Sequence, residues 1–169
     1  MERELRGSAR GGDEAPVLIG VISDTHGLLR PEAVEALAGV ELIIHAGDIG
    51  KEEVIDELRE LARVVAVRGN VDRDGWAANL PFVERMTVRG VSLLMIHNRK
   101  ELNVRAPGER PRVIVYGHTH KPLIDEKDGV LYLNPGSAGK RRFDLPVTVA
   151  RLMIEGGQVT AEIVELERR

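Results

Sequence analysis

The chain has 169 residues, no cysteine and a formal net charge of −3 at pH 7, which suits one domain with a hydrophobic core and excludes disulfides and thiolate metal sites. The small net charge gives no basic face for a nucleic-acid partner, and no apolar run approaches the ~20 residues that span a bilayer. We therefore expect a cytoplasmic protein with neither a membrane nor a nucleic acid as its partner.

The first 15 residues are charged and glycine-rich, and they lack the apolar segment of a signal peptide. We expect residues 1–15 to be a disordered tail, or an extension added for expression. Residues 16–169 are then expected to form a single domain.

The first half of the chain alternates apolar runs with amphipathic stretches. Three apolar runs predict buried strands at 17–22, 41–45 and 63–67. A helix is expected from Pro31 to Gly39, and a second over 51–61, where apolar residues recur on one face. This β-α-β-α-β order predicts a parallel sheet with right-handed crossovers.

The second half is richer in hairpins. Turn residues separate three pairs of strand-like segments: 82–88 with 91–97, 121–125 with 130–133, and 146–154 with 158–164. A further buried strand is expected at 113–116, and a short helix at 99–105. A mostly parallel sheet followed by a hairpin-rich one predicts two sheets packed face to face, with helices outside.

Polar residues that could bind a metal or act in catalysis are concentrated in five loops, each at the end of an apolar run. The loops lie around residues 23–26, 45–50, 68–72, 96–98 and 117–120, and all five histidines lie in or beside them. In open α/β sheets, ligands bind outside the carboxyl ends of the strands. We therefore expect the five loops to meet at one site.

Seven side chains in these loops are candidate metal ligands: Asp24, His26, Asp48, Asn70, His97, His118 and His120. Carboxylates and imidazoles without sulfur suit Mn, Fe, Co, Ni or Zn. The set is too large for one tetrahedral ion, so it predicts two ions. Residues two apart on an extended strand point the same way, which would let Asp24 and His26 bind one ion together.

The ligands divide into two sets that share Asp48. We expect one ion on Asp24, His26, Asp48 and His120, and the other on Asp48, Asn70, His97 and His118. Two divalent ions about 3.7 Å apart repel by roughly 18 kcal/mol at an effective dielectric constant of about 20. An anion must therefore separate them, and Asp48 with a bridging hydroxide would fill that role. Such a paired site attracts a phosphate ester and stabilises both the attacking and the leaving oxygen.

The ordered motifs resemble a known family. They are Asp24-Thr25-His26, Gly47-Asp48, Gly69-Asn70, His97 and Gly117-His118-Thr119-His120, and together they resemble the calcineurin-like metallophosphoesterase superfamily. Segments 67–70 and 134–137 are similar to its small YfcE-type phosphodiesterases. The resemblance runs from about Val17 onward and implies an α/β protein, a four-layer α/β/β/α sandwich of two mixed sheets. It also implies hydrolysis of phosphoesters by a dinuclear centre, often assayed with manganese, and it gives the same seven ligands.

The resulting expectation is a hydrolase of small phosphodiesters. A metal-bridging hydroxide attacks phosphorus, with Asp48, Asn70 and His97 as the catalytic residues. Two alternatives stay open: a metal-binding scaffold resembling the retromer subunit Vps29, and a phosphomonoesterase or nucleotidase. Assembly as a homodimer or homotetramer is also left open.

Two positions depart from the family pattern. Val71 stands where many members have a histidine that protonates the leaving oxygen, and general-acid catalysis is typically worth about 10²–10⁴-fold. We therefore expect a preference for good leaving groups such as aryl esters. Asn98 follows His97 where the family commonly has glycine.

Simpler roles are also weighed for the ligands. Asp24 or Asp48 alone would be a helix cap. His97 alone would be a hydrogen-bonded core histidine, and Asn70 a turn residue.

Other side chains are expected around the centre rather than on the metal. His45 and Asp72 are expected to support the loops by hydrogen bonds, with a turn role as the alternative for Asp72. Arg141 and Arg142 are candidate phosphate contacts, although a solvated pair of charges is the simpler interpretation.

Overall fold

The computed structural model describes residues 2–5, 15–103, 108 and 110–166, whose strands form two sheets. The five-stranded sheet has the order β11-β10-β2-β3-β4, and the six-stranded sheet the order β1-β5-β6-β7-β9-β8. The strands are β1 (Glu2–Leu5), β2 (Val17–Ile22), β3 (Leu42–His45), β4 (Arg63–Ala66), β5 (Val83–Val88), β6 (Val91–Ile96), β7 (Val113–Val115), β8 (Leu123–Lys127), β9 (Val130–Asn134), β10 (Thr148–Glu155) and β11 (Gln158–Glu165).

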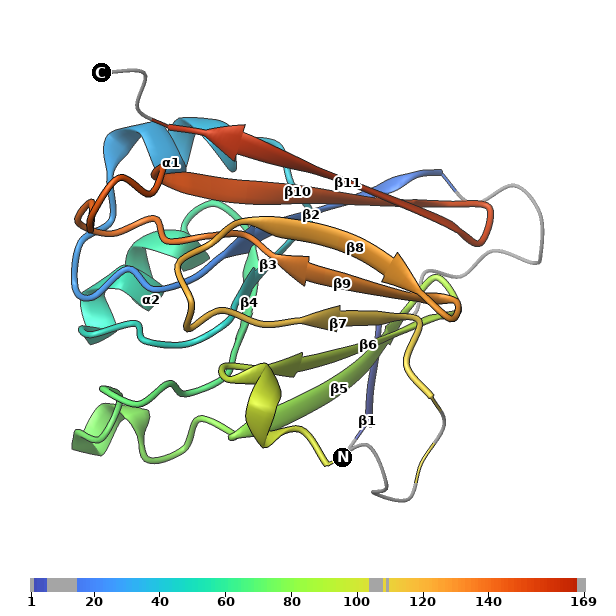
Figure 1. The fold of residues 1–169 in the computed structure, drawn as a ribbon, viewed down its shortest axis with the longest axis horizontal. Helices are drawn as coiled ribbons and strands as arrows, with labels where there is room; N and C mark the ends of the chain where they lie inside the picture. The colour runs from blue at the N-terminus through green and yellow to red at the C-terminus, as the bar shows by residue number, and fades with distance from the viewer. Residues whose placement is uncertain (1, 6–14, 104–107, 109, 167–169) are drawn as a thin grey trace.

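The predicted β-α-β-α-β unit is confirmed. Strands β2, β3 and β4 are parallel neighbours, and α1 (Pro31–Ala36) and α2 (Glu52–Arg59) connect them (Figure 1). Leu37, Val54 and Leu58 bury the helical segments against the outer face of this sheet. Within the described ranges, no helix is long and apolar enough to cross a bilayer.

The prediction of a hairpin-rich second sheet was wrong for the last hairpin. Strands β10 and β11 join the first sheet instead, where β10 runs antiparallel to β2. In the six-stranded sheet, β6, β7 and β9 are parallel to one another. Turn residues specify a hairpin locally, whereas the sheet that it joins depends on which distant strand has an unpaired edge.

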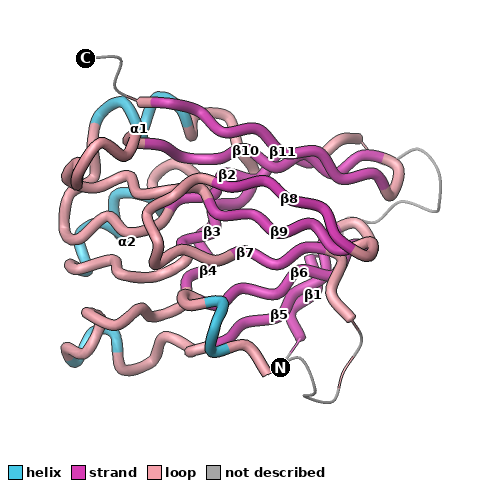
Figure 2. The backbone as a smooth tube through the Cα atoms, in the orientation of Figure 1, coloured by secondary structure: helices cyan, strands magenta, loops and turns pink. Residues whose placement is uncertain are grey.

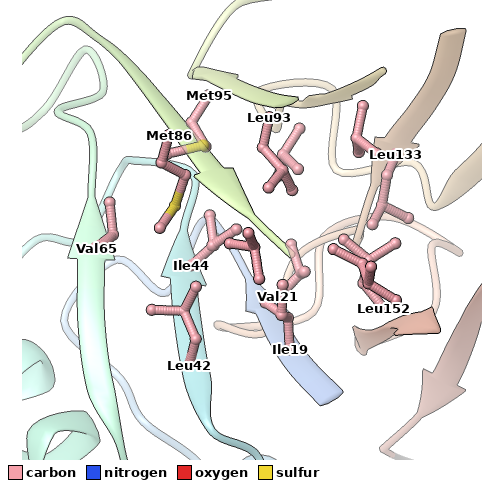
Figure 3. Packing of buried hydrophobic residues seen from close by; sticks show 14 of the residues in the cluster. Ile19, Val21, Leu42, Ile44, Val65, Met86, Leu93, Met95, Leu133 and Leu152 are labelled. Carbon is pink, nitrogen blue, oxygen red and sulfur yellow. The ribbon is translucent and has the colours of Figure 1, made fainter. Parts of the chain in front are cut away.

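The main core lies between the two sheets (Figure 3). Ile19 and Ile44 from the first sheet pack with Met86, Leu93 and other buried side chains of the second. The predicted α/β class with two packed mixed sheets is therefore confirmed.

In the described part of the chain, few residues cover the outer face of the six-stranded sheet. The predicted helix at 99–105 is a single 3-10 turn, η2 (Arg99–Glu101), while residues 104–107 lie outside the described part. Leu102 packs beside this turn against buried side chains that include Leu94 and Ile114. A second 3-10 turn, η1 (Gly75–Ala77), was not predicted.

The N-terminal residues differ from the expected disordered tail. Glu2–Leu5 form β1, which pairs in parallel with β5 from Glu2 opposite Arg85 to Leu5 opposite Val88. The expectation of disorder is wrong for these residues, because the backbone of an edge strand can pair with a segment of almost any composition. Residues 1 and 6–14 lie outside the described part.

Candidate metal centre

The five predicted loops converge at the carboxyl ends of β2, β3, β4, β6 and β7. The Asp24 amide donates to the Gly47 carbonyl at 3.0 Å, and the Gly117 amide donates to the His97 carbonyl at 2.9 Å. A further bond joins the two sheets, since the His118 amide donates to Oδ2 of Asp24 at 3.1 Å. Figure 2 shows these connecting segments gathered on one side of the molecule, at the left of the view.

Asp24 is fully buried, and its two carboxylate oxygens have different contacts. Oδ2 accepts hydrogen bonds from the Ser23 hydroxyl at 2.7 Å and from the His118 amide at 3.1 Å. Oδ1 has no hydrogen-bond partner among the described residues. Three imidazole Nε2 atoms surround it: His120 at 3.2 Å, and His26 and His97 at 3.9 Å each.

Asp48 is arranged in the same way. Its Oδ1 accepts the Val71 amide at 3.1 Å. Its Oδ2 lies 3.3 Å from Nε2 of His97 and 3.8 Å from Nε2 of His26. Each aspartate therefore anchors a neighbouring loop with one oxygen and presents the other to the centre. Neither caps a helix, because Arg30 and Lys51 occupy the N-cap positions of α1 and α2.

The unsatisfied atoms fit a cation. Nε2 of His26 and of His97 and Oδ1 of Asp24 are buried without a hydrogen-bond partner in the described part of the chain. Nδ1 of His97 lies 2.7 Å from the Ala46 carbonyl, so this nitrogen carries the proton and Nε2 presents its lone pair to the centre. Buried polar atoms without partners are costly, and a divalent ion would satisfy all three with oxygen and imidazole ligands.

The ionisation of the carboxylates also suits a cation. Burial raises the pKa of Asp24 and Asp48, but contacts with His120 and His97 outweigh it, and the pKa of Asp48 falls to about 2. Both groups are thus ionised at neutral pH. Burial lowers the pKa of His97, but the carboxylates of Asp48 and Asp24 reverse this and leave it raised. A proton on His97 would therefore compete with a metal ion.

The ligand atoms form two close groups that share Asp24. One contains Asp24, His26 and His120, and the other contains Asp24, Asp48 and His97. From the sequence, Asp48 was expected to be the shared residue. Asp48 nonetheless faces one histidine of each predicted set, as the distances above show.

The two remaining predicted ligands lie at the outer side of the centre. Asn70 and His118 are both exposed. The His118 ring packs edge-on against His97, with 5.2 Å between ring centroids, whereas the His120 ring lies 5.5 Å from that of His26. His118 and His120 therefore contact different histidines of the centre.

The backbone conformation that brings Asp24 and His26 to one centre differs from the prediction. Asp24 and His26 have φ values of 55° and 47°, so they do not continue strand β2. Asp48, His118 and His120 are also left-handed. Non-glycine residues rarely adopt this conformation, and such strain is concentrated at functional sites. The strand-alternation argument for Asp24 and His26 was therefore wrong, although both side chains reach the same centre.

Two glycines allow the loops to approach this closely. A Cβ atom at Gly69 would collide with the amide and carboxylate of Asp48, and one at Gly117 would lie 2.6 Å from Oδ2 of Asp24. Only glycine leaves room for these contacts.

Asp72 clamps the Asp48 loop to the Asn70 loop. Its carboxylate accepts amide hydrogens from Ile49 and Gly50 at 3.0 Å and from Gly69 at 2.8 Å, and it is buried. These bonds connect the two loops beside the candidate centre.

His45 links the first two loops while remaining neutral. The Thr25 hydroxyl donates to the Ile49 carbonyl at 2.9 Å, so it accepts from Nε2 of His45 at 3.0 Å. Nδ1 of His45 then accepts the Gly47 amide at 3.1 Å. Burial lowers the pKa of this imidazole to about 4. Both ring nitrogens therefore make hydrogen bonds that hold the two loops together.

Asn134 and Ser137 also support the centre, and both lie in segment 134–137, which was noted from the sequence only for its resemblance to the YfcE-type phosphodiesterases. The Asn134 amide group donates to the Gly117 carbonyl at 3.1 Å, and the Ser137 hydroxyl donates to the Asp24 carbonyl at 3.0 Å. Their position at and just after the end of β9, beside the end of β7, is the feature that could have identified them.

The remaining predicted positions lie around the rim. Arg141 and Arg142 are exposed, and Nε of Arg141 donates to the Leu145 carbonyl at 3.2 Å. Burial lowers the pKa of His26, and the charge of Arg142 adds to this effect. Asn98 begins η2 by accepting the Lys100 amide at 3.1 Å, so its replacement of glycine leaves His97 buried in place.

The chain is similar in sequence to known phosphoesterases and in fold to a solved structure of another protein. Residues 17–157 match the calcineurin-like phosphoesterase superfamily domain. The chain is 37% identical over 164 residues to a probable metallophosphoesterase of Methanocaldococcus jannaschii, covering 89% of this chain and 82% of that relative. It is 27% identical over 139 residues to phosphodiesterase YfcE of Escherichia coli, and the match covers 68% of this chain and 76% of that relative. Vacuolar protein sorting 29 from Cryptosporidium parvum shares the fold, with a TM-score of 0.73 at 21% identity. The superposition covers 92% of this chain and 100% of that one.

Proposed function

The chain belongs to the calcineurin-like phosphoesterase superfamily, and from this we propose that it is a metal-dependent phosphodiesterase acting on small phosphodiesters. The family implies divalent metal binding, and relatives of the chain are named phosphodiesterases. The observation that carries the proposal is the set of buried atoms on Asp24, His26 and His97 that have no hydrogen-bond partner among the described residues. A cytoplasmic location belongs to the same proposal.

The proposed centre holds two ions, with manganese as the first candidate. Asp24, His26 and His120 would bind one ion, and Asn70, His97 and His118 the other, with Asp48 shared. When bound, the ions would supply a deprotonated water nucleophile and neutralise the charge that develops on the phosphoryl oxygens.

The protein's own groups prepare the site for this chemistry. The carboxylates of Asp24 and Asp48 are ionised at neutral pH, because their pKa values are lowered. The bond from His97 to Ala46 fixes the imidazole, and Asn70 is exposed where a substrate oxygen can reach it. Val71 is half-exposed beside Asn70 and cannot donate a proton to the leaving oxygen.

A scaffold role resembling that of Vps29 is the main alternative from another class. The fold alone supports it, since the likeness is at 21% identity. The complete candidate ligand set of this chain favours the enzyme. A phosphomonoesterase or nucleotidase is the second alternative.

A metal titration with two aryl substrates separates these functions. The purified chain is incubated with Mn, Ni, Co or Zn and assayed with bis-p-nitrophenyl phosphate and p-nitrophenyl phosphate. The proposal expects metal-dependent turnover that is faster for the diester. Faster turnover of the monoester would favour a monoesterase, and no turnover with any divalent ion would favour the scaffold.

A further inference from the structure

The loop between β9 and β10 passes directly against the candidate metal centre. A Cβ atom at Gly139 would lie 2.6 Å from the Thr25 carbonyl oxygen, and Nε of Arg30 donates to the Gly139 carbonyl at 3.0 Å. Residues 140–144 follow at once and are exposed. In Figure 1 this orange-red segment lies on the same side of the molecule as the blue segment after β2. The loop therefore forms part of the rim of the site.

Phe143 on this loop contributes little to the fold. Its side chain is 91% exposed, whereas the next most exposed large hydrophobic residue in the described ranges, Val71, is 48% exposed. Its φ of 55° is also unfavourable for a bulky residue. Neither burial nor backbone preference explains a phenyl ring here, so the ring is available to a molecule outside the protein.

The neighbours of Phe143 indicate what that molecule is. Arg142 precedes it and is also exposed, three residues after Gly139, whose backbone packs against Thr25 between the candidate ligands Asp24 and His26. An arginine binds a phosphate, and an adjacent aromatic ring stacks on a base. A lipid or protein surface would require a broader apolar patch, but Phe143 is the sole exposed large hydrophobic residue in segment 138–146.

We propose that Phe143 stacks on the base of a nucleoside phosphodiester while Arg142 pairs with its phosphate. This inference rests on the phosphodiesterase function proposed above and names its substrate class. The reaction is the same hydrolysis: the oxygen of water bonds to phosphorus and the bond to the leaving alcohol or phenol breaks. A nucleoside monophosphate remains, one proton of water goes to solvent, and the leaving oxygen takes up a proton according to its pKa.

Two esters with the same leaving group test the role of Phe143. They are the p-nitrophenyl ester of thymidine 5′-monophosphate and methyl p-nitrophenyl phosphate, assayed with the full chain and manganese. We expect kcat/KM to be about ten- to a hundredfold higher for the nucleoside ester. Phe143→Ala should bring the ratio of the two values close to one, and Phe143→Trp should preserve it. No preference in the unmodified chain, or an unchanged ratio in Phe143→Ala, would overturn the proposal.

Further variants separate the phosphate contact from the stacking contact. Arg142→Ala should lower kcat/KM for both esters alike, because both carry the phosphate, and no loss for either ester would contradict its assigned role. Met153→Ala is the matched control: Met153 is 37% exposed on β10 and pairs with Leu18 at the opposite end of β2 from the centre. This change should leave both values unaltered.

A binding measurement distinguishes failure of this inference from failure of the proposed function. If neither these two esters nor bis-p-nitrophenyl phosphate were hydrolysed, the phosphodiesterase proposal would fail. Thymidine 5′-monophosphate titrated into the manganese-loaded protein would still test the stacking. About tenfold or greater weakening by Phe143→Ala would support it, and unchanged affinity would refute it.

Discussion

The Oδ1 atom of Asp24 lies 3.2 Å from Nε2 of His120, although the two residues follow strands of different sheets, β2 and β7. The candidate centre is therefore built across the interface between the sheets. A cation bound there would hold both sheets together, so metal binding and folding stability should be linked.

Metal addition should raise the melting temperature. At an ion concentration 100 times the dissociation constant, the expected gain in the free energy of unfolding is about 2.7 kcal/mol for one site. Differential scanning calorimetry with and without manganese measures it. Asp24→Asn should lose most of the gain, and an equal gain in this variant and the unmodified chain would contradict the assignment.

Val71 should make the rate sensitive to the leaving group. Across a series of aryl phosphodiesters, kcat/KM should fall steeply as the pKa of the leaving phenol rises, because no acid is available at this position. The Val71 amide, not its side chain, bonds to Asp48, so Val71→His should preserve the loop and flatten the dependence. A flat plot for the unmodified chain would show that another residue supplies the proton.

Asp72→Asn should weaken both the fold and metal binding. An amide oxygen and an NH₂ group cannot accept all three backbone N–H groups that meet the carboxylate. We expect a loss of about 1–3 kcal/mol in the free energy of unfolding and roughly 10–100-fold weaker metal binding. Urea unfolding and calorimetric titration measure the two effects.

Asp56→Asn is the matched control for that change. Asp56 lies on α2 and forms an exposed ion pair with Arg59 at 3.3 Å. Surface pairs contribute little, so stability and metal affinity should stay nearly unchanged. Equal effects of the two variants would show that the clamp formed by Asp72 has no special role.

The buried His45 should make the metal-free protein sensitive to acid. The unfolded imidazole takes up a proton from about pH 6.5 downward, whereas the lowered pKa in the folded state is about 4. Its contribution is therefore complete above pH 6.5 and is lost as the pH falls towards 4, by about 3 kcal/mol. Urea unfolding in chelator at several pH values measures this loss. His45→Gln should show a shallower dependence; an identical slope would mean that other groups cause it.

The sequence predicted the elements well where the information is local. Apolar periodicity located β2, β3, β4 and both helices, and the types of residue at the strand ends located the candidate ligands. The position of the last hairpin could not be predicted, because the available edge of β2 is visible only in the assembled sheet.

Parts of the site also depend on contacts that the sequence does not display. The left-handed backbone at Asp24 and His26 comes from loop-to-loop packing, not from the adjoining strand. Asn134 and Ser137 have the composition of a turn, and their support of the ligand loops follows from hydrogen bonds to distant carbonyls. Phe143 was missed because its exposure is a property of the folded chain.

Anomalous diffraction from crystals grown with manganese would show whether Asp48 is shared between two cations. The expected result is two manganese peaks about 3.5–4 Å apart, with Asp48 between them, Asp24, His26 and His120 on one side and Asn70, His97 and His118 on the other. A single peak, or peaks joined through Asp24 with Asp48 bound to neither, would contradict it.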